Sequence, residues 1–342
     1  MVNSKAVQLE LQPLTPFPLS NRTFLAREYH SGGELTKLLI LATGYKLLGF
    51  QTQKGICKGH IVSAQVSPIS RVMLHSTSLP LLISGKRNPD VVIFAAAPPA
   101  NPRGRLDVPY FWKNQAMTWD FLVGGFGLNE TQCHYMMSPN HIQATLIVDR
   151  KCLLHALDNE ENRSVYEYMC GANSVQMPAQ LWFRFVNYIC LGCFNPELAS
   201  KLSCPLLSIL NLLKDGSYQH AMPSRKLRQS SERVLDQLEV VLNHIHKCEC
   251  NVECLGAILS LGRTQLNTAF SELFHCTPMQ FLRYIRLERA MLLLRSPSER
   301  AIAGLYSIED IAGNVGFGSV STFRKNFNDW FCTAPKTVWV DT

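Results

Sequence analysis

The chain has 342 residues, more than a typical single domain, so two domains are the first expectation. Hydrophobic residues make up 46% of the sequence and charged residues 17%, a balance that excludes a largely disordered chain. The net charge of +7 suits an acidic partner such as nucleic acid, but it does not by itself require one.

The first residues and the apolar runs argue against a secreted or membrane-spanning protein. Residues 1–27 contain Lys5, Glu10 and three prolines, and they lack the apolar core of a secretion signal. The apolar run at residues 91–97 ends at Pro98-Pro99, well short of membrane-spanning length. We therefore expect a cytoplasmic protein without membrane contact, whose twelve cysteines are reduced thiols and mostly small core residues.

The first two hundred residues predict a β-rich region followed by helices. Apolar runs of strand length, separated by Pro, Gly and Ser, cover residues 59–66, 72–76, 79–84 and 91–97. Several short strands at this spacing predict a barrel or a double-sheet roll, with a strong turn signal at residues 101–104. From about Arg163 the apolar spacing becomes helical, and residues 198–213 form a second, strongly apolar stretch.

A polar, basic passage at residues 216–231 is the best candidate for a linker. We place the domain boundary within it, so that residues 1–224 form one domain and residues 225–342 the other. Ser231 is expected to cap a helix whose apolar residues recur at helical spacing from 234 to 245. The predicted fold class is therefore α+β, with a β-rich N-terminal domain that also carries helices and an all-α C-terminal domain.

One sequence pattern occurs twice in the last ninety or so residues. The first copy contains Leu255-Gly256, Leu261-Gly262, Leu266, Phe270 and Thr277-Pro278, and the second contains Ile311-Ala312, Phe317-Gly318, Phe323, Phe327 and Thr333-Ala334-Pro335. Each copy predicts a short helix, a tight turn and a second helix with apolar residues four apart, which is the layout of a helix-turn-helix. Two such units, at about residues 251–274 and 307–331, favour a DNA-binding transcription regulator over an enzyme.

In the first unit, Asn251 is expected to cap the first helix by accepting a hydrogen bond from its exposed amides. In the second helix Leu266 and Phe270 point inward, so the polar residues between them face outward. The predicted DNA-binding residues of this helix are Arg263, Thr264, Gln265, Asn267 and Thr268. Their chemistry suits base edges, because Asn prefers adenine, Arg prefers guanine and a threonine methyl packs on thymine.

Thr277-Pro278 is expected to start a long helix that holds the two units at a fixed separation. In the second unit Ser307 and Asp310 predict a capping box at the first helix. Phe323 and Phe327 anchor the second recognition helix. Its predicted DNA-binding residues are Ser319, Val320, Ser321, Thr322, Arg324 and Lys325.

Residues 251–338 resemble the AraC/XylS family of bacterial transcription regulators on the strings LGAILSLGRTQLNTAF, TPMQFLRYIRLERAMLLL and SIEDIAGNVGFGSVSTFRKNF. The resemblance implies that each recognition helix enters one of two successive major-groove segments. By position, the matching base-reading residues are Thr264, Asn267, Thr268, Val320, Ser321, Thr322 and Lys325. It also implies an activator more often than a repressor. Its partners would be double-stranded promoter DNA, RNA polymerase, a small-molecule effector and a second copy of the chain.

The sequence departs from the family pattern at two turns. His275 and Cys332 stand where the family usually has glycine, so these turns are expected to be built differently. The connection from Arg295 to Tyr306 is longer than usual, and together with the string RTQLNTAF it resembles the ethanolamine-operon branch. The family also implies that residues 1–224 bind an effector or form a dimer.

A cluster of histidines and cysteines supports an alternative class of function, a metal-binding sensor. The cluster comprises His244, His246, Cys248, Cys250 and Cys254, whose thiolates and imidazoles suit zinc or copper. Its spacing is not the C-x2-C of a structural zinc site, and it spans a helix end, a loop and a new helix. That arrangement favours partly exposed residues that hold no metal.

Catalysis has little support in the sequence. The glycine run at residues 124–127 lacks the spacing of a dinucleotide-binding loop, and neither a phosphate-binding loop nor a nucleophile elbow occurs. Asp107, His134, His141 and Asp149 are scattered, and such residues are usually structural or line a pocket. We therefore expect neither enzyme activity nor a cofactor.

Overall fold

The structure is a computed structural model of the chain. It describes residues 24–96, 110–112, 115–117, 121–137, 139, 141–216, 223–226, 228–245 and 250–341. The turn predicted at residues 101–104 lies outside these ranges. No helix among them is both long and apolar enough to cross a bilayer.

The N-terminal part is built around a seven-stranded antiparallel sheet in the order β1-β3-β4-β11-β6-β9-β12. Its strands are β1 (Phe24–Tyr29), β3 (Gly59–Ser67), β4 (Ser70–Thr77), β6 (Val91–Ala96), β9 (Leu122–Gly124), β11 (His141–Asp149) and β12 (Ser174–Gln176). The strands predicted at residues 59–66, 72–76 and 91–97 are confirmed as β3, β4 and β6. The alternating or continuous apolar residues of these runs predict strands, and the folded chain forms strands there.

Two three-stranded sheets complete the β structure. The first has the order β10-β5-β2, with β10 (Gln132–Met137), β5 (Leu81–Lys86) and β2 (Lys46–Gln51). The second has the order β13-β8-β7, with β13 (Pro223–Lys226), β8 (Gln115–Met117) and β7 (Tyr110–Trp112). One apolar core joins the first of these sheets to the large sheet, because Ile83 of β5 and Met73 of β4 belong to it. The predicted β-rich domain is confirmed, with two sheets sharing a core.

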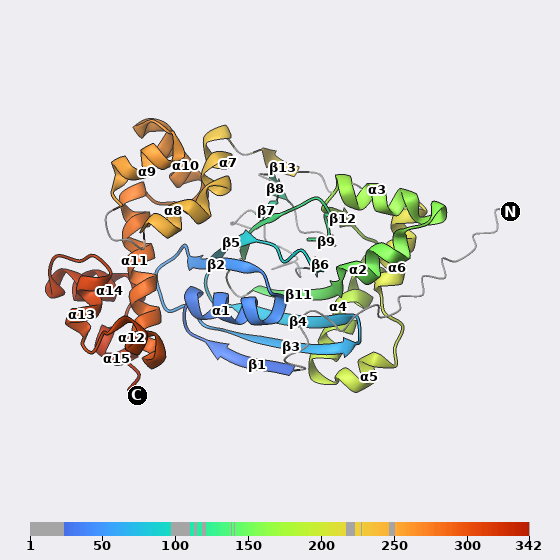
Figure 1. Ribbon diagram of the computed structural model, residues 1–342, viewed down its shortest axis with the longest axis horizontal. Helices are drawn as coiled ribbons and strands as arrows, with labels where there is room; N and C mark the ends of the chain where they lie inside the picture. Colours follow the sequence, from blue (N-terminus) through green and yellow to red (C-terminus); the bar gives the residue numbers. More distant parts are fainter. Residues whose placement is uncertain are drawn as a thin grey trace.

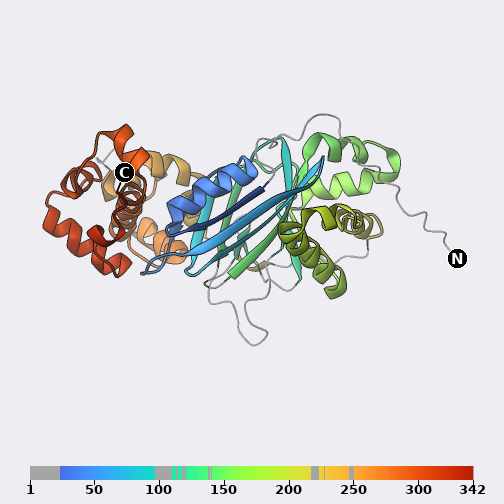
Figure 2. The same cartoon turned by 90° about the horizontal axis from the view of Figure 1, so that it is seen from below.

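Helices cover the other face of the large sheet. They are α2 (Arg150–Leu157), α3 (Arg163–Gly171), α4 (Ala179–Phe194), α5 (Pro196–Ser200) and α6 (Leu206–Lys214). Val72, next to Met73 in β4, packs into their core because successive strand residues face opposite sides. The helical pattern from Arg163 is confirmed, while α2, which follows β11 directly, was not predicted. Figures 1 and 2 place α2–α6 at the end of the sheet away from the C-terminal helices.

The passage predicted as a linker contains strand β13, which pairs with β8 and shows an irregular register at Pro223/Arg225. The proposed boundary at residue 224 therefore falls within a paired strand. Ser231 does not cap a helix, because α7 (Gln229–Asp236) already begins at Gln229. Ser231 is buried instead, and its hydroxyl donates to Glu272 Oε2 at 2.5 Å. Serine often caps a helix, but the Ser231 side chain is instead buried against the helix that contains Glu272.

The C-terminal part is all helical. After α7 come α8 (Leu238–Ile245), α9 (Val252–Leu259), α10 (Arg263–Phe274), α11 (Pro278–Arg295), α12 (Pro297–Ala303), α13 (Ile308–Asn314), α14 (Val320–Phe331) and α15 (Pro335–Val338). They form two apolar cores, one around α9 and α10 and one around α13 and α14. Helix α11 contributes to both, and Figure 1 shows it running between the two units.

The N-terminal part packs against both helix-turn-helix units. Phe50, from β2, meets Phe281 of α11 edge to face at 5.8 Å between ring centroids, within the core of the first unit. Helix α1 (Gly32–Thr43) lies against α11, with ion pairs Glu34–Arg295 at 2.6 Å and Lys37–Glu299 at 2.7 Å. The Gly55 N–H donates to the Trp330 carbonyl of α14 at 2.7 Å.

Candidate nucleic-acid interface

The first unit begins as its sequence predicts. The Asn251 side chain accepts from the Cys254 N–H at 2.8 Å and caps α9. At Gly256, a Cβ would lie 3.1 Å from the Leu261 carbonyl oxygen, so this glycine allows the turn to fold closely over the helix. Gly262 then stands at the N-cap of α10.

Helix α10 presents the predicted polar residues on its outer side. Leu266 and Phe270 are buried, whereas Arg263, Thr264, Gln265 and Asn267 are exposed and Thr268 is half-buried. The Gln265 side chain is partly engaged, because its Oε1 accepts from the Gly262 N–H at 3.3 Å. Arg263, Thr264, Asn267 and Thr268 therefore keep their polar groups available for a partner.

A surface hollow of about 790 Å³ runs along this unit. Arg263 and Asn267 line it together with the start of α11 at Thr277, Pro278 and Met279. The helix-turn-helix pattern did not predict that the first turn of α11 shares the recognition surface. In the sequence, Thr277 and the proline that follows it mark where that helix begins.

The second unit repeats the design. Ser307 and Asp310 form the predicted capping box at α13, with hydrogen bonds of 3.0 Å and 2.9 Å in the two directions. These bonds and the Tyr306 N–H hold the pKa of Asp310 below its usual value. The turn passes through Gly316, whose φ of 82° is left-handed and favours glycine.

Helix α14 exposes most of its predicted DNA-binding residues. Ser319 is its N-cap and accepts from the Thr322 N–H at 3.2 Å, so this serine has a structural task. Ser321, Thr322, Arg324 and Lys325 are exposed, while Val320 is half-buried against the core of the unit. Arg324 pairs with Glu309 of α13 at 2.8 Å, a contact that helical periodicity could not predict.

The two turns without glycine have the ordinary geometry of a helix end. His275 and Cys332 close α10 and α14 in the left-handed region, at φ of 52° and 55°. The expectation that these turns are built differently is wrong. The helix ends adopt the left-handed conformation, in which the Cβ of His275 and of Cys332 is strained against the backbone.

The long connection after α11 contains a short helix, α12, and a buried arginine. Arg300 is 4% exposed and donates to the carbonyls of Leu293 and Leu294 at 3.0 Å and 2.7 Å, and of Val340 at 2.5 Å. Its guanidinium also lies 4.0 Å from the ring centroid of Trp339. The connection therefore caps the end of α11 and fixes the C-terminal segment to it.

The histidine and cysteine cluster is only partly within the described residues. The side chains of His244, His246 and Cys248 lie outside them. Cys250 is buried, and burial raises the pKa of its thiol to about 12. The described residues contain no group of three or more His, Cys, Asp or Glu that could bind a metal ion. Nothing among the described residues favours the metal-sensor alternative.

Two of the scattered acid–base candidates, Asp149 and His134, lie within the described residues and have separate structural positions. Asp149 caps α2 by accepting from the Cys152 N–H at 2.8 Å, and His134 bonds Ser84 at 2.7 Å. Burial lowers the pKa of His134 to about 4. Asp107 and the His141 side chain lie outside the described residues.

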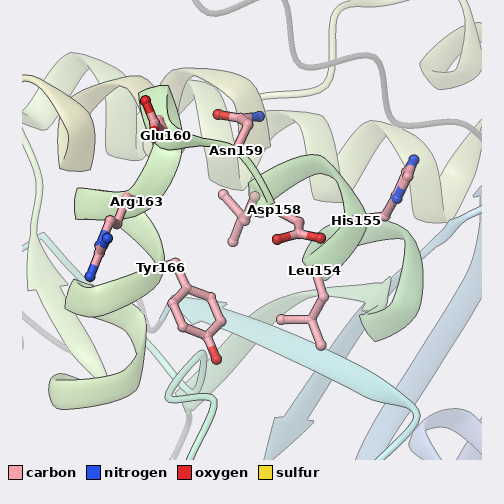
Figure 3. Close-up of a pocket in the computed structure, with 8 residues that line it drawn as sticks. Leu154, His155, Asp158, Asn159, Glu160, Arg163 and Tyr166 are labelled. Carbon is pink, nitrogen blue, oxygen red and sulfur yellow. The ribbon is translucent and has the colours of Figure 1, made fainter.

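The N-terminal part also has an open hollow of about 630 Å³ beside α2 and α3. His155, Asp158 and Arg163 are among its lining residues. In Figure 3 the side chains of His155 and Arg163 point away from one another instead of converging on a common point. These two side chains therefore do not meet in the hollow.

Comparison with known proteins identifies the C-terminal part. Residues 255–338 match a family model described as a helix-turn-helix domain. The chain is 22% identical over 140 residues to the HTH-type transcriptional regulator GbdR of Pseudomonas aeruginosa, across 41% of this chain and 36% of that relative. The match thus spans about a third of the relative's length.

Solved structures give further similarities. The DNA-binding domain of AdpA in complex with a target DNA is 26% identical and covers 31% of this chain and 87% of that one, with a TM-score of 0.27. An AraC-type regulator from Chromobacterium violaceum is 21% identical, covering 32% and 90%, with a TM-score of 0.28. ToxT from Vibrio cholerae is 12% identical, covering 93% and 98%, with a TM-score of 0.32.

Proposed function

We propose that this chain is a transcription regulator of the AraC/XylS type, which binds a specific promoter sequence through its C-terminal part and regulates its transcription. The match of residues 255–338 to a family model described as a helix-turn-helix domain supports this proposal. The proposal rests on one arrangement that occurs in both helix-turn-helix units. In α10 and in α14, buried phenylalanines fix one face of a capped helix while polar side chains remain exposed on the other.

The proposed base-reading residues are Arg263, Thr264, Asn267 and Thr268 in α10 and Val320, Ser321, Thr322 and Lys325 in α14. Arg324 is better suited to a phosphate, because Glu309 already holds its guanidinium beside α13. Gln265 and Ser319, whose side chains cap their own helices, would support the helix ends more than they read bases.

The separation of the two units constrains the site on DNA. Helix α11 has 18 residues and is therefore about 27 Å long at 1.5 Å per residue. Two recognition helices on one face of the duplex enter the major groove about one turn, or 34 Å, apart unless the DNA bends. One copy of the chain should then protect two major-groove segments about 10 base pairs apart in an asymmetric site.

Footprinting of the full-length chain on a promoter found by genomic binding-site mapping tests this proposal. We expect two protected segments for one bound chain. The double variant Ser321→Ala/Lys325→Ala should lose protection in one segment and keep it in the other. A single protected groove in the parent protein, or protection that requires a symmetric site, would contradict the proposal.

We extend the proposal to the N-terminal part, which would bind a small-molecule effector or a second copy of the chain within residues 1–224. A cavity between the two sheets, lined by residues that include Tyr45, Arg87 and Gln143, has a volume of only about 40 Å³. It holds about one water molecule, so an effector at this place would have to separate the sheets. For a second copy, the exposed apolar side chains of Phe183, Phe194 and Leu198 offer a contact surface.

We also propose that the chain activates transcription and contacts RNA polymerase. Transcription in vitro with the purified chain and RNA polymerase on the mapped promoter tests it. Transcript should increase when the chain is added and should not increase with Asn267→Ala. Repression of the same promoter by the chain would contradict the activator role while leaving DNA binding in place.

A further inference from the structure

One acidic side chain is buried where three elements meet. Glu288 projects from the middle of α11 and is 6% exposed. It faces the Gly32 N–H at the start of α1 and the Trp330 indole of α14. Glu288 thus lies where the N-terminal part, the spacer helix and the second recognition helix come together.

The polar atoms at this junction are incompletely satisfied. Both carboxyl oxygens of Glu288 and the Trp330 Nε1 are buried without a hydrogen bond of good geometry. Among the described residues, no salt bridge reaches the Glu288 carboxyl. A charged carboxylate is costly in such a place, whereas a neutral carboxyl costs much less.

The neighbouring charges do not relieve this cost. From α1, Glu34 faces the carboxyl with the same charge and is itself held by Arg295 at 2.6 Å. Lys37, also on α1, is paired with Glu299. Arg289 follows Glu288 in α11 and lines a hollow of about 220 Å³ that Glu288 also borders.

The loop after β2 contributes one more titratable group, the buried Cys57 thiol, whose pKa is raised to about 12 by burial and by the negative charge of Glu288. Arg295 also contacts His30 Nδ1 at 3.0 Å, and burial and Arg295 lower the pKa of that imidazole. The groups around Glu288 therefore leave the neutral carboxyl as the favoured form.

We propose that Glu288 is a proton-sensitive latch, which in its neutral form holds helix α1 of the N-terminal part against α11. Separating α1 from α11 would open the carboxyl to water and let it ionise. Because α11 joins the two helix-turn-helix units, the latch connects the N-terminal part to both recognition helices.

The direction of the pH effect follows from the two states. Burial raises the pKa of Glu288 from 4.5 to about 8 in the docked state, and water returns it towards 4.5 in the separated state. The docked state therefore binds the extra proton. Docking is strongest below the lower pKa, weakens as pH rises through the window between the two values, and levels off above about 8.

Hydrogen–deuterium exchange of the full-length chain, corrected for intrinsic exchange rates, tests the latch between about pH 6 and pH 9. Protection of α1 and of the facing part of α11 should fall by up to about tenfold per pH unit and then level off. In Glu288→Gln, which is neutral at every pH, the protection should not change with pH.

Glu34→Gln is the matched control, because it removes the neighbouring carboxylate that pairs with Arg295. This variant should lower protection and keep a pH dependence, with a narrower pH window because the Glu34 charge helps to raise the pKa of Glu288. A flat profile in the parent protein, or the same pH dependence in Glu288→Gln, would overturn the proposal. If Glu288→Gln does not fold, the pKa values of the glutamates in the parent protein can be measured by carbon-13 NMR. If no glutamate of the native protein titrates above neutral pH, the proposal is overturned.

Discussion

Trp330 and Tyr284 stack face to face, with ring centroids 3.5 Å apart and ring planes inclined by 13°. Trp330 belongs to the second recognition helix and Tyr284 to the spacer helix α11. The stacked pair therefore fixes the second recognition helix to the element that also carries the first unit. The separation of helices α10 and α14 depends on such contacts as much as on the length of α11.

Asn267→Ala should weaken binding to the specific promoter site by about 1–3 kcal/mol and change binding to random DNA little. The amide is exposed beside the buried Leu266, where it can bond a base edge. Competition binding with both DNAs measures the two affinities. Ser271→Ala, one turn further along the same helix, serves as the control and should leave both unchanged. Equal losses on the two DNAs for Asn267→Ala would show that the amide reads no base.

Lys325→Ala should reduce the salt dependence of DNA binding by about one unit of the logarithmic slope. The lysine is exposed on α14, and its charge suits a phosphate or a guanine. Affinities measured across a series of salt concentrations give the slope. Lys201→Ala removes an equally exposed lysine of the N-terminal part and should leave the slope unchanged. An unchanged slope for Lys325→Ala would place that residue away from the DNA.

His275→Gly and Cys332→Gly should each raise the free energy of unfolding by about 1 kcal/mol. Both residues occupy the left-handed region, where a Cβ is strained and glycine is not. Urea denaturation measures the change. The reverse substitution is the control, because Gly304 closes α12 at φ of 67° with open space around it, and Gly304→Ala should lower stability by a similar amount. Destabilisation by either glycine variant would mean that the native side chain makes compensating contacts.

Arg300→Met should lower the free energy of unfolding by roughly 2–4 kcal/mol. The substitution removes the guanidinium donor from the carbonyls of Leu293, Leu294 and Val340, and it removes the cation from the Trp339 ring. The Leu293 and Leu294 carbonyls keep one backbone N–H donor each. Thermal or urea unfolding measures the loss. Arg283→Met, at an exposed position of α11, should change stability by less than about 0.5 kcal/mol. Similar losses of stability for the two variants would show that the contacts of the Arg300 guanidinium are not their cause.

Local patterns predicted most of the elements near the candidate site. The caps at Asn251 and Ser307, the helix start at Thr277-Pro278 and the inward phenylalanines follow from residue chemistry within a few positions, so one sequence was enough to place them. The exposure of Asn267 and Lys325 then follows from helical geometry. The exposure of these polar side chains was therefore predictable, whereas their contact with DNA stays a prediction.

Contacts between distant segments were not predictable in the same way. Glu34 and Arg295 are separated by 261 positions, and nothing in the periodicity of either helix pairs them. The buried environment of Ser231 likewise depends on Glu272, which lies on another helix. The ethanolamine-operon resemblance also stays a prediction, because the compared proteins described above do not carry that name.

The hydrogen bond from Gly55 to the Trp330 carbonyl joins an early segment of the chain to a late one. The last carbonyls of a helix have no partner within it, and one of those of α14 is satisfied by a loop that precedes it by about 275 residues. During synthesis that loop leaves the ribosome long before α14 does. Helix α14 therefore completes its last turn against a loop that was synthesised earlier, and a substitution that displaces this loop would remove a hydrogen bond from the end of α14.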